Sequence, residues 1–287
     1  MNVVQGPGQR VLRQEIADHD DRVRGLLPKI IFVTGTGRCG TMLACRLLSL
    51  SPRVQCEHES CFRHESMMSF HTRGDRSGYA DDIDRSLEPR RQSLQRLGKV
   101  LGISSGHLYF AIPQLYERYG EEARFILLVR RPEQFARSAA ARGFFDPSHP
   151  NPCHQIEPHR DEEIHERWVR ASPLERTLWY WALVNQFVLD AFATMSAGVC
   201  RIIRIEQMRT NLAMDLCRFV GINDVEPHQV SRLLAQRVNA SPGEPDAIDV
   251  NPHSTPISMP PVDGWTSPQR RLLVRYTDDL RRKLYRD

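Results

Sequence analysis

The sequence predicts an α/β domain of three layers, in which a central, mostly parallel β-sheet lies between helices. Two short apolar runs, 30–33 and 123–129, have the character of strands that are buried on both faces. Each run leads through a short turn into a stretch of good helix formers. Such strand–turn–helix units build parallel sheets, because parallel neighbours must be joined by a crossover. We expect one domain over residues 28–287, preceded by a polar N-terminal arm, 1–27.

The composition is that of a soluble globular protein, with 40% hydrophobic and 26% charged residues. The net charge of +4, with arginine in large excess over lysine, suits an anionic ligand but is too small to indicate nucleic acid. No apolar run approaches the roughly 20 residues that span a bilayer, and the N-terminus lacks a signal-peptide core. We therefore expect a cytoplasmic protein without a membrane partner. The seven cysteines contain no CxxC pair, which favours reduced thiols over a zinc site or a disulfide framework.

The first unit combines a strand at 30–33, a glycine-rich loop at 34–41 and a helix at 42–50. This geometry holds a phosphate, because glycines let backbone N–H groups approach the anion and the helix N-terminus adds a positive dipole end. The loop has the outline of a P-loop, but no lysine follows Gly40, and the cation is Arg38 within the loop. Chemistry on a nucleoside triphosphate needs that lysine and is therefore disfavoured. A glycine-rich turn without a ligand remains the simpler alternative.

A second short strand is expected at 54–56, and the charged cluster Glu57-His58-Glu59 follows it. In an open α/β sheet, ligands lie beyond the carboxyl ends of the strands. The glycine loop and this cluster should therefore face one pocket, where the cluster offers candidates for a general base. The alternative is a solvated loop with a few charges.

The strand at 123–129 leads into a basic turn and then a helix at 134–142, with Pro132 near its first position. Arg130 lies at the carboxyl end of this strand, and Ser138 lies about two turns into the helix. Both side chains are placed to reach a second phosphate. A cation at a helix N-terminus is disfavoured by the dipole, which makes an anionic ligand for Arg130 more plausible than a purely structural role.

The rest of the chain is expected to complete the domain. Residues 61–101 form an excursion over the sheet that includes a helix at 88–100, and 144–174 form a second long connection. A third element begins at 102, followed by helices at 112–119 and 175–195, a strand at 200–205, a helix at 211–220, a long loop at 237–264 and a final helix at 267–286.

Three landmarks resemble sulfotransferases that use 3′-phosphoadenosine-5′-phosphosulfate (PAPS). The stretch FVTGTGRCGT is similar to the family's loop for the 5′-phosphosulfate, and FILLVRRPEQFARS is similar to its 3′-phosphate motif, an Arg followed eight residues later by a Ser. A Trp-rich helix with Val184-Asn185, the strand RIIRIEQM and a late Trp265 form a third, looser landmark. The resemblance covers residues 28–145 well and 175–285 loosely, and implies the P-loop NTPase-like sulfotransferase fold.

The stretch GRCGTMLACRLLSLSPRVQCEHES is also locally similar to tyrosylprotein sulfotransferases, and the family likeness extends to carbohydrate sulfotransferases. In the tyrosylprotein enzymes, a Pro-x-Val-x-Cys-Gly-Glu-Glu-Thr-Arg run contains the base as its second Glu, and that Glu falls on Glu59. His58 stands where the other Glu would be, and Cys61 stands where the Arg would be. The missing Arg speaks against a protein-tyrosine acceptor.

The resemblance implies transfer of the sulfuryl group of PAPS to a hydroxyl of a small metabolite or a glycan, with release of PAP. Glu59 would be the general base, His58 the second candidate for that role, and Arg38 would stabilise charge on the leaving oxygen. Residues 61–101 and 144–174 would shape the acceptor pocket. A metal is not required, because a sulfuryl group carries less charge than a phosphoryl group. The donor would be bound by Gly37, Arg38, Cys39, Gly40, Thr41, Met42, Arg130 and Ser138.

Two other functions stay open at this stage. One is a P-loop kinase or another nucleotide-binding protein, and the other is a non-catalytic module that binds PAP. The sequence leaves the identity of the acceptor and the oligomeric state open.

Overall fold

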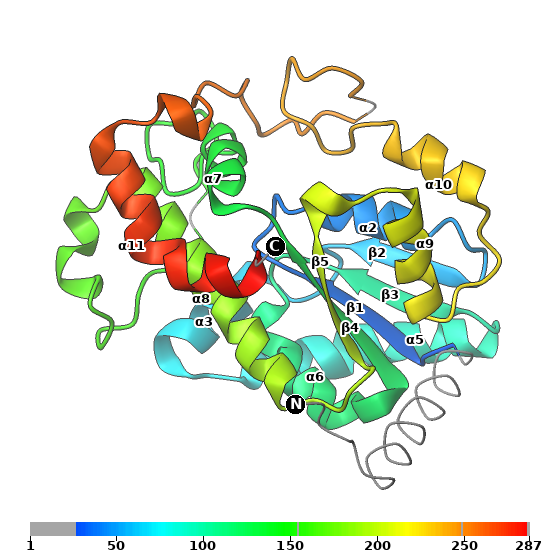
Figure 1. Ribbon diagram of the computed structural model, residues 1–287. Helices are drawn as coiled ribbons and strands as arrows, with labels where there is room; N and C mark the ends of the chain where they lie inside the picture. The colour runs from blue at the N-terminus through cyan, green and yellow to red at the C-terminus, as the bar shows by residue number, and fades with distance from the viewer. Residues whose placement is uncertain (1–26, 154, 248, 286–287) are drawn as a thin grey trace, which may run out of the picture.

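The protein has a central five-stranded β-sheet in which every pair of neighbouring strands is parallel, with the order β2-β3-β1-β4-β5 (Figure 1). The computed structural model describes residues 27–153, 155–247 and 249–285. The prediction of a mostly parallel sheet is confirmed. The strands are β1 (Ile30–Thr34), β2 (Val54–His58), β3 (Val100–Ser104), β4 (Ala123–Val129) and β5 (Cys200–Arg204).

Helices cover both faces of the sheet, which makes the three predicted layers (Figure 1). One apolar cluster joins one sheet face to α2, α9 and α10, and a larger cluster joins the other face to α3, α5, α6 and α8. The helices are α2 (Thr41–Leu48), α3 (His64–Arg73), α4 (Ser77–Asp81), α5 (Glu88–Arg96), α6 (Ile112–Tyr119), α7 (Pro132–Ala141), α8 (Pro173–Ala193), α9 (Thr210–Phe219), α10 (Pro227–Leu234) and α11 (Ser267–Leu284), with a π-helical turn at Asp82–Leu87.

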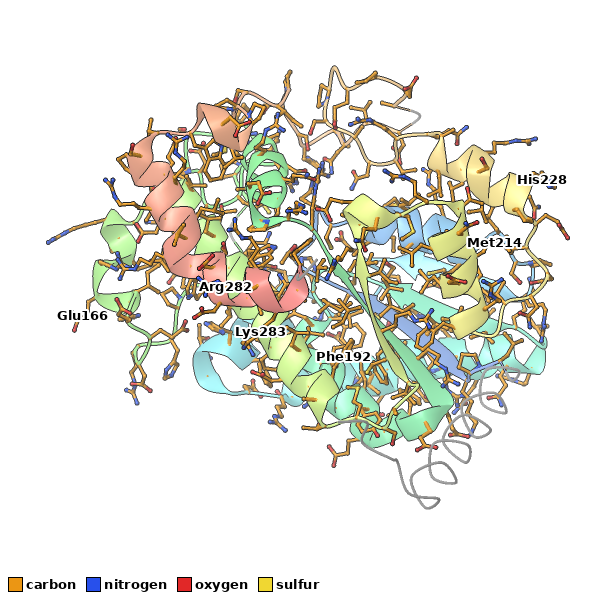
Figure 2. The ribbon with its side chains drawn as sticks, in the orientation of Figure 1. Glu166, Phe192, Met214, His228, Arg282 and Lys283 are labelled. Carbon is orange, nitrogen blue, oxygen red and sulfur yellow. The ribbon has the colours of Figure 1, made fainter. Side chains whose placement is uncertain are left out.

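The strand pleat explains why the central strands are apolar throughout. Along β1, Ile30 and Phe32 enter the larger cluster, whereas Ile31 and Val33 enter the cluster under α2, and all four are fully buried. Successive side chains of a strand point to opposite faces, so a sheet covered on both sides needs apolar residues at every position. The charged residues Glu166 and Arg282 instead point outward from the periphery (Figure 2).

The predicted helix at 88–100 is too long. The helix α5 ends at Arg96, Gly98 adopts a left-handed backbone with φ of 69°, and Val100 is already the first residue of β3. The N–H of Lys99 donates to the carbonyl of Leu94 at 2.9 Å, which is the hydrogen bond of a glycine-terminated helix end. The excursion predicted to end at 101 therefore ends at 99.

Other predicted boundaries hold within a few residues. The loop predicted at 237–264 is structured by bridges that pair Arg237 with Ala247 and Ala240 with Val250, and by a short 3₁₀ turn near its end. The N-terminal arm lies outside the described residues except for Leu27, and Arg286, the last residue of the predicted final helix, is also outside them. Within the described residues, no helix combines the length and apolarity needed to cross a membrane.

Packing of α6 against the sheet allows a direct test of the fold. Leu115 on α6 is fully buried, whereas Leu97 is 69% exposed. Replacing Leu115 with Ala should lower the free energy of unfolding by about 2–5 kcal/mol, because it removes apolar contacts and leaves a cavity. The matched change Leu97→Ala should alter it by no more than about 0.5 kcal/mol. Urea unfolding of both variants makes the comparison, and equal losses would contradict this placement of α6.

Candidate functional site

The loop between β1 and α2 is confined between neighbouring segments, which explains its glycines. A Cβ atom on Gly35 would lie 2.5 Å from the carbonyl oxygen of Leu128, and one on Gly40 would lie 2.6 Å from Cδ1 of Ile205. Gly40 also has a φ of 99°, a left-handed conformation that glycine adopts at little cost. The loop therefore holds one shape, pressed against the ends of β4 and β5.

Cys39 fills the space beneath the loop. Its side chain is fully buried, and a Cβ on Gly35 would lie 2.5 Å from its Sγ atom, as close as it would lie to the Leu128 carbonyl oxygen. Burial raises the pKa of the Cys39 thiol to about 11, so the group is protonated and uncharged. Cys39 borders the cavity described next, but its side chain supports the loop from below.

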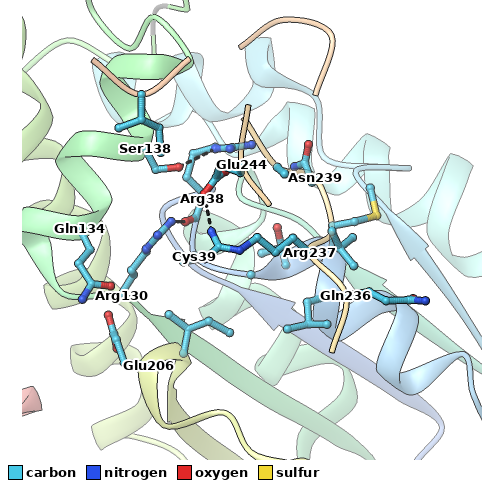
Figure 3. A pocket seen from close by; sticks show the side chains of 18 residues that line it. Arg38, Cys39, Arg130, Gln134, Ser138, Glu206, Gln236, Arg237, Asn239 and Glu244 are labelled. Carbon is cyan, nitrogen blue, oxygen red and sulfur yellow. Dashed lines mark hydrogen bonds and ion pairs between the residues drawn. The ribbon is translucent and has the colours of Figure 1, made fainter. Parts of the chain in front are cut away.

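Two sequence motifs that are separated by about a hundred residues meet at one point (Figure 3). The guanidinium Nε of Arg38 donates a hydrogen bond to the hydroxyl of Ser138 on α7, at 3.1 Å. Nη1 of Arg130, at the end of β4, donates to the carbonyl oxygen of Arg38 at 3.0 Å. The β1 loop, the end of β4 and the first turns of α7 are thus tied together by hydrogen bonds.

The electrostatics of this point favour a bound anion. The Nη1 atom of Arg38 is buried and has no hydrogen-bond partner among the described residues. Burial, and next the charge of Arg130, lower the pKa of Arg38 to about 10, and burial lowers the pKa of Arg130 as well. Both groups remain protonated at neutral pH, so two like charges and an unpaired donor share one partly buried place. An anion between them would relieve the repulsion and satisfy the donor.

A first cavity of about 360 Å³ lies in front of these arginines (Figure 3). Two carboxylates also line it, but both have other partners. Glu206 accepts a hydrogen bond from the backbone N–H of Arg131 at 2.6 Å, and Glu244 pairs with Arg237 at 2.6 Å. The predicted donor-binding residues that line the first cavity are Arg38, Cys39, Gly40, Thr41, Met42, Arg130 and Ser138.

A second cavity of about 460 Å³ lies on the other side of the glycine loop. It shares Arg38, Thr41, Met42 and Asn239 with the first cavity, so the two cavities have a common wall. The predicted residues Gly37, His58 and Glu59 line this second cavity. The structure therefore divides the predicted residues between two adjoining spaces, with Arg38 and Thr41 bordering both.

The pair His58 and Glu59 lies at the carboxyl end of β2, as predicted. Nε2 of His58 is 3.0 Å from the hydroxyl of Thr41, a hydrogen bond whose direction follows the tautomer of the imidazole. Burial lowers the pKa of His58, although the charge of Glu59 acts in the opposite direction, so the imidazole is neutral near pH 7. Glu59 is exposed, and its backbone N–H donates to the carbonyl of Ser104 at 3.0 Å.

The third member of the predicted cluster points elsewhere. The carboxylate of Glu57 forms an ion pair with Arg90 of α5 and does not line either cavity. Successive residues at the end of a strand alternate in direction, which separates Glu57 from His58. The strand β3 also lies between β1 and β2. The glycine loop nevertheless reaches His58 through the hydroxyl of Thr41. The loop packs closely against the end of β3, since a Cβ atom on Gly106 would lie 3.0 Å from the backbone nitrogen of Gly37.

Several residues of the two cavities were not predicted. His107 follows the carboxyl end of β3, lines the second cavity and has a pKa that burial lowers. The strand-end rule that identified Glu59 would have identified His107 too, had β3 been placed between β1 and β2. Asn239 and Glu244 come from the loop predicted at 237–264, and Arg142 is the last residue of the helix predicted at 134–142. No local pattern marks any of the three as a cavity residue.

Backbone strain gathers at the site. In the described chain, Arg38, Glu59 and Asn239 are among six residues other than glycine that have a positive φ, with values of 51°, 52° and 53°. Such conformations are uncommon outside glycine and persist where the surrounding structure enforces them. All three residues line a cavity, and two of them were predicted to be catalytic.

These features define an α/β protein with a glycine-rich loop and two buried arginines at the carboxyl edge of a parallel sheet. Solved structures that share this fold include sulfotransferases. The mouse sulfotransferase SULT7A1, solved in complex with PAP, aligns with a TM-score of 0.52 and 17% identity, over 90% of this chain and 87% of the mouse chain. A sulfotransferase from Alicyclobacillus acidocaldarius aligns over 90% of this chain and 96% of its own, with 17% identity and a TM-score of 0.48.

The likeness lies in the fold. No protein-family profile matches the chain, and no curated protein matches its sequence. The predicted fold is confirmed, because the mouse structure covers most of the chain.

The unpaired Nη1 atom of Arg38 allows a test with a simple anion. Millimolar inorganic pyrophosphate should raise the melting temperature, because a ligand at about 100 times its Kd stabilises the folded state by roughly 2.7 kcal/mol. Thermal unfolding with pyrophosphate, and with sodium chloride at equal ionic strength, measures the shift. The shift should be lost in Arg38→Gln and kept in Arg96→Gln, which removes an exposed arginine. An undiminished shift in Arg38→Gln would contradict an anion site at the loop.

Proposed function

We propose that this protein is a sulfotransferase that moves the sulfuryl group of PAPS to a hydroxyl of a small metabolite or a glycan. The observation that carries the proposal is the junction of Arg38, Ser138 and Arg130, which lines the first cavity. The wall of this cavity that contains Arg38 also borders the second cavity. A two-phosphate donor fits the first cavity, and a hydroxyl acceptor fits the second. The shared fold with a mouse sulfotransferase that was solved with PAP supports the choice of donor.

The donor is held by two groups of residues. The backbone N–H groups of the loop from Gly37 to Met42, at the start of α2, bind the 5′-phosphosulfate together with the side chain of Arg38. Arg130 and Ser138 bind the 3′-phosphate, the group that distinguishes PAPS from adenosine 5′-phosphosulfate. The bond between Arg38 and Ser138 couples these two ends of the donor.

The reaction is an in-line displacement at sulfur. The acceptor oxygen forms a bond to sulfur while the bond between sulfur and the bridging oxygen of the phosphate breaks. Glu59 takes the proton of the acceptor hydroxyl, and His58 is the second candidate for this role. PAP leaves with the new negative charge, which Arg38 stabilises. Positioning and cationic groups suffice for this chemistry, so no metal is required.

One contact speaks against the kinase alternative. In P-loop nucleoside triphosphatases, the Ser or Thr that follows the loop binds Mg²⁺. Here the Thr41 hydroxyl is hydrogen-bonded to His58, and the loop lacks the lysine that such enzymes place after the last glycine. Both differences favour transfer of a less charged group. A non-catalytic module that binds PAP would share the first cavity, and turnover separates it from an enzyme.

The role of Arg130 predicts a difference between two nucleotides. Arg130→Ala should weaken the binding of PAP by about 10- to 100-fold, because it removes a hydrogen bond to a charged group. It should weaken the binding of adenosine 5′-phosphosulfate much less, since that ligand lacks the 3′-phosphate. Isothermal titration of both nucleotides, with ATP as a third ligand for the kinase alternative, makes the measurement.

The adjacent Arg131 provides the control for this prediction. Its guanidinium lies over the ring of Tyr285, 5.0 Å from the ring centroid, and it does not line the first cavity. Arg131→Ala should bind PAP with an affinity within about threefold of that of the unmodified protein. Such a change is smaller than the loss expected when a hydrogen bond to a charged group is removed. Equal losses for PAP and adenosine 5′-phosphosulfate in Arg130→Ala would remove its assignment to the 3′-phosphate.

The choice between the two bases predicts a second pair of outcomes. Glu59→Gln should reduce turnover by about 10²–10⁴-fold, because it removes the proton acceptor, while the affinity for PAP stays nearly unchanged. Turnover is followed with labelled PAPS in a screen of hydroxyl acceptors, and PAP binding by titration. If His58→Ala shows this pattern and Glu59→Gln does not, His58 is the base. If no acceptor is labelled while PAP binds tightly, the non-catalytic alternative holds.

A further inference from the structure

The second cavity contains a cation that the proposed reaction does not use. Arg142 follows α7 directly, is half-buried and lines the second cavity but not the first. Its Nη1 atom donates a hydrogen bond to the carbonyl of Asn151 at 3.2 Å. No carboxylate of the described residues forms an ion pair with it. The helix dipole favours a positive charge just after the last turn of a helix. This accounts for an arginine at the end of α7, but not for the contribution of its side chain to the wall of a cavity.

None of the other charged groups that line the second cavity forms an ion pair with Arg142 among the described residues. Glu59 is the only carboxylate among its described lining residues. Arg38 is engaged with Ser138 and faces the donor side as well. His58 and His107 are uncharged near neutral pH, because burial lowers the pKa of each. Arg142 also lowers the pKa of Arg38, so it lies near enough for the two cations to repel each other.

We propose that the acceptor is a hydroxylated small molecule that carries an acidic group, and that Arg142 binds this group. This inference rests on the proposed function, because it names the class of acceptor for the same reaction. A guanidinium forms strong hydrogen bonds with carboxylate and phosphate oxygens, and both kinds of acidic group fit the argument. Arg142 is thus a specificity-determining residue, and it takes no part in breaking or forming the bonds at sulfur.

The remaining walls of the cavity fit such a molecule. A volume of about 460 Å³ lies in the range of small-molecule sites. The buried rings of Phe144 and Tyr180 provide flat apolar surface, and Gln155 and Asn251 provide amide groups that bind hydroxyls. Because Glu59 is the proposed base, the acid of the acceptor has to lie away from it, beside Arg142, so that the hydroxyl points to the common wall.

The test compares acidic and neutral forms of two hydroxylated skeletons. The sugar set is glucuronate, glucose 6-phosphate and glucose, and the aryl set is 4-hydroxyphenylacetate and its amide. Each compound is titrated calorimetrically into the PAP-saturated protein and into the PAP-free protein. In at least one set, an acidic member should bind about tenfold or more tightly than the neutral member, as a hydrogen bond to a charged group predicts. The two acids of the sugar set separate carboxylate from phosphate recognition.

Variants of Arg142 decide whether the preference comes from this residue. Arg142→Gln should abolish the preference for the acid, and Arg142→Lys should keep part of it. The affinity for PAP and the KM for PAPS should stay unchanged in Arg142→Gln. Arg160→Gln, which removes an arginine with an 81% exposed side chain outside the cavity, should behave like the unmodified protein.

The outcomes separate this inference from the proposed function. If neither skeleton shows a preference for the acid, or if the preference survives in Arg142→Gln, the inference is overturned. A raised KM for PAPS in Arg142→Gln, with no effect on acid binding, would instead assign Arg142 to the sulfuryl group and also overturn it. Failure of PAP to bind in the initial saturation step overturns the proposed function, while the PAP-free titrations still measure the preference for acids.

Discussion

Repulsion between two guanidinium groups in a partly buried place is the constraint on which the site depends. Arg38 and Arg130 come from different strand ends, and the fold holds them together with hydrogen bonds to Ser138 and to the Arg38 carbonyl. Burial also disfavours the charged form of each group, which is why the pKa of both arginines is lowered. A bound anion between the two groups would relieve this repulsion and satisfy the unpaired Nη1 of Arg38. The rigid glycine loop, the short β4–α7 turn and the parallel sheet beneath them all maintain this arrangement.

The common wall places two cavities side by side at one edge of the sheet. Thr41 contacts His58 through its hydroxyl and borders both cavities. Arg38 also borders both cavities and is hydrogen-bonded to Ser138. In the proposed reaction, the sulfuryl group would cross only this wall on its way from donor to acceptor. Arg38 and Glu59 both have a left-handed backbone and both line the second cavity, so uncommon backbone conformations occur beside the wall.

Much of the fold could be predicted from the sequence, because the buried strands 30–33 and 123–129 are apolar throughout and each is followed by a recognisable helix start. The same local patterns identified Arg38, Glu59, Arg130 and Ser138, all of which line a cavity. The hydrogen bond between Arg38 and Ser138 could not be predicted, since it depends on how distant segments pack. The helix end at Gly98 was missed because glycine alone does not show whether a helix ends or continues. Asn239 lies in a loop without periodicity and Arg142 at the end of a predicted helix, and only tertiary structure places the two on a cavity wall.

The residues that line the second cavity come from two kinds of segment, the ends of strands and long connections. The loop and strand ends that form the common wall are fixed by the core, whereas Phe144, Gln155, Asn251 and His253 come from long connections between helices. Insertions and exchanges in connections disturb a core far less than changes in strands do. Under the proposed function, exchanges in the connections that carry these four residues would change the acceptor while the sheet and its glycine loop stay the same.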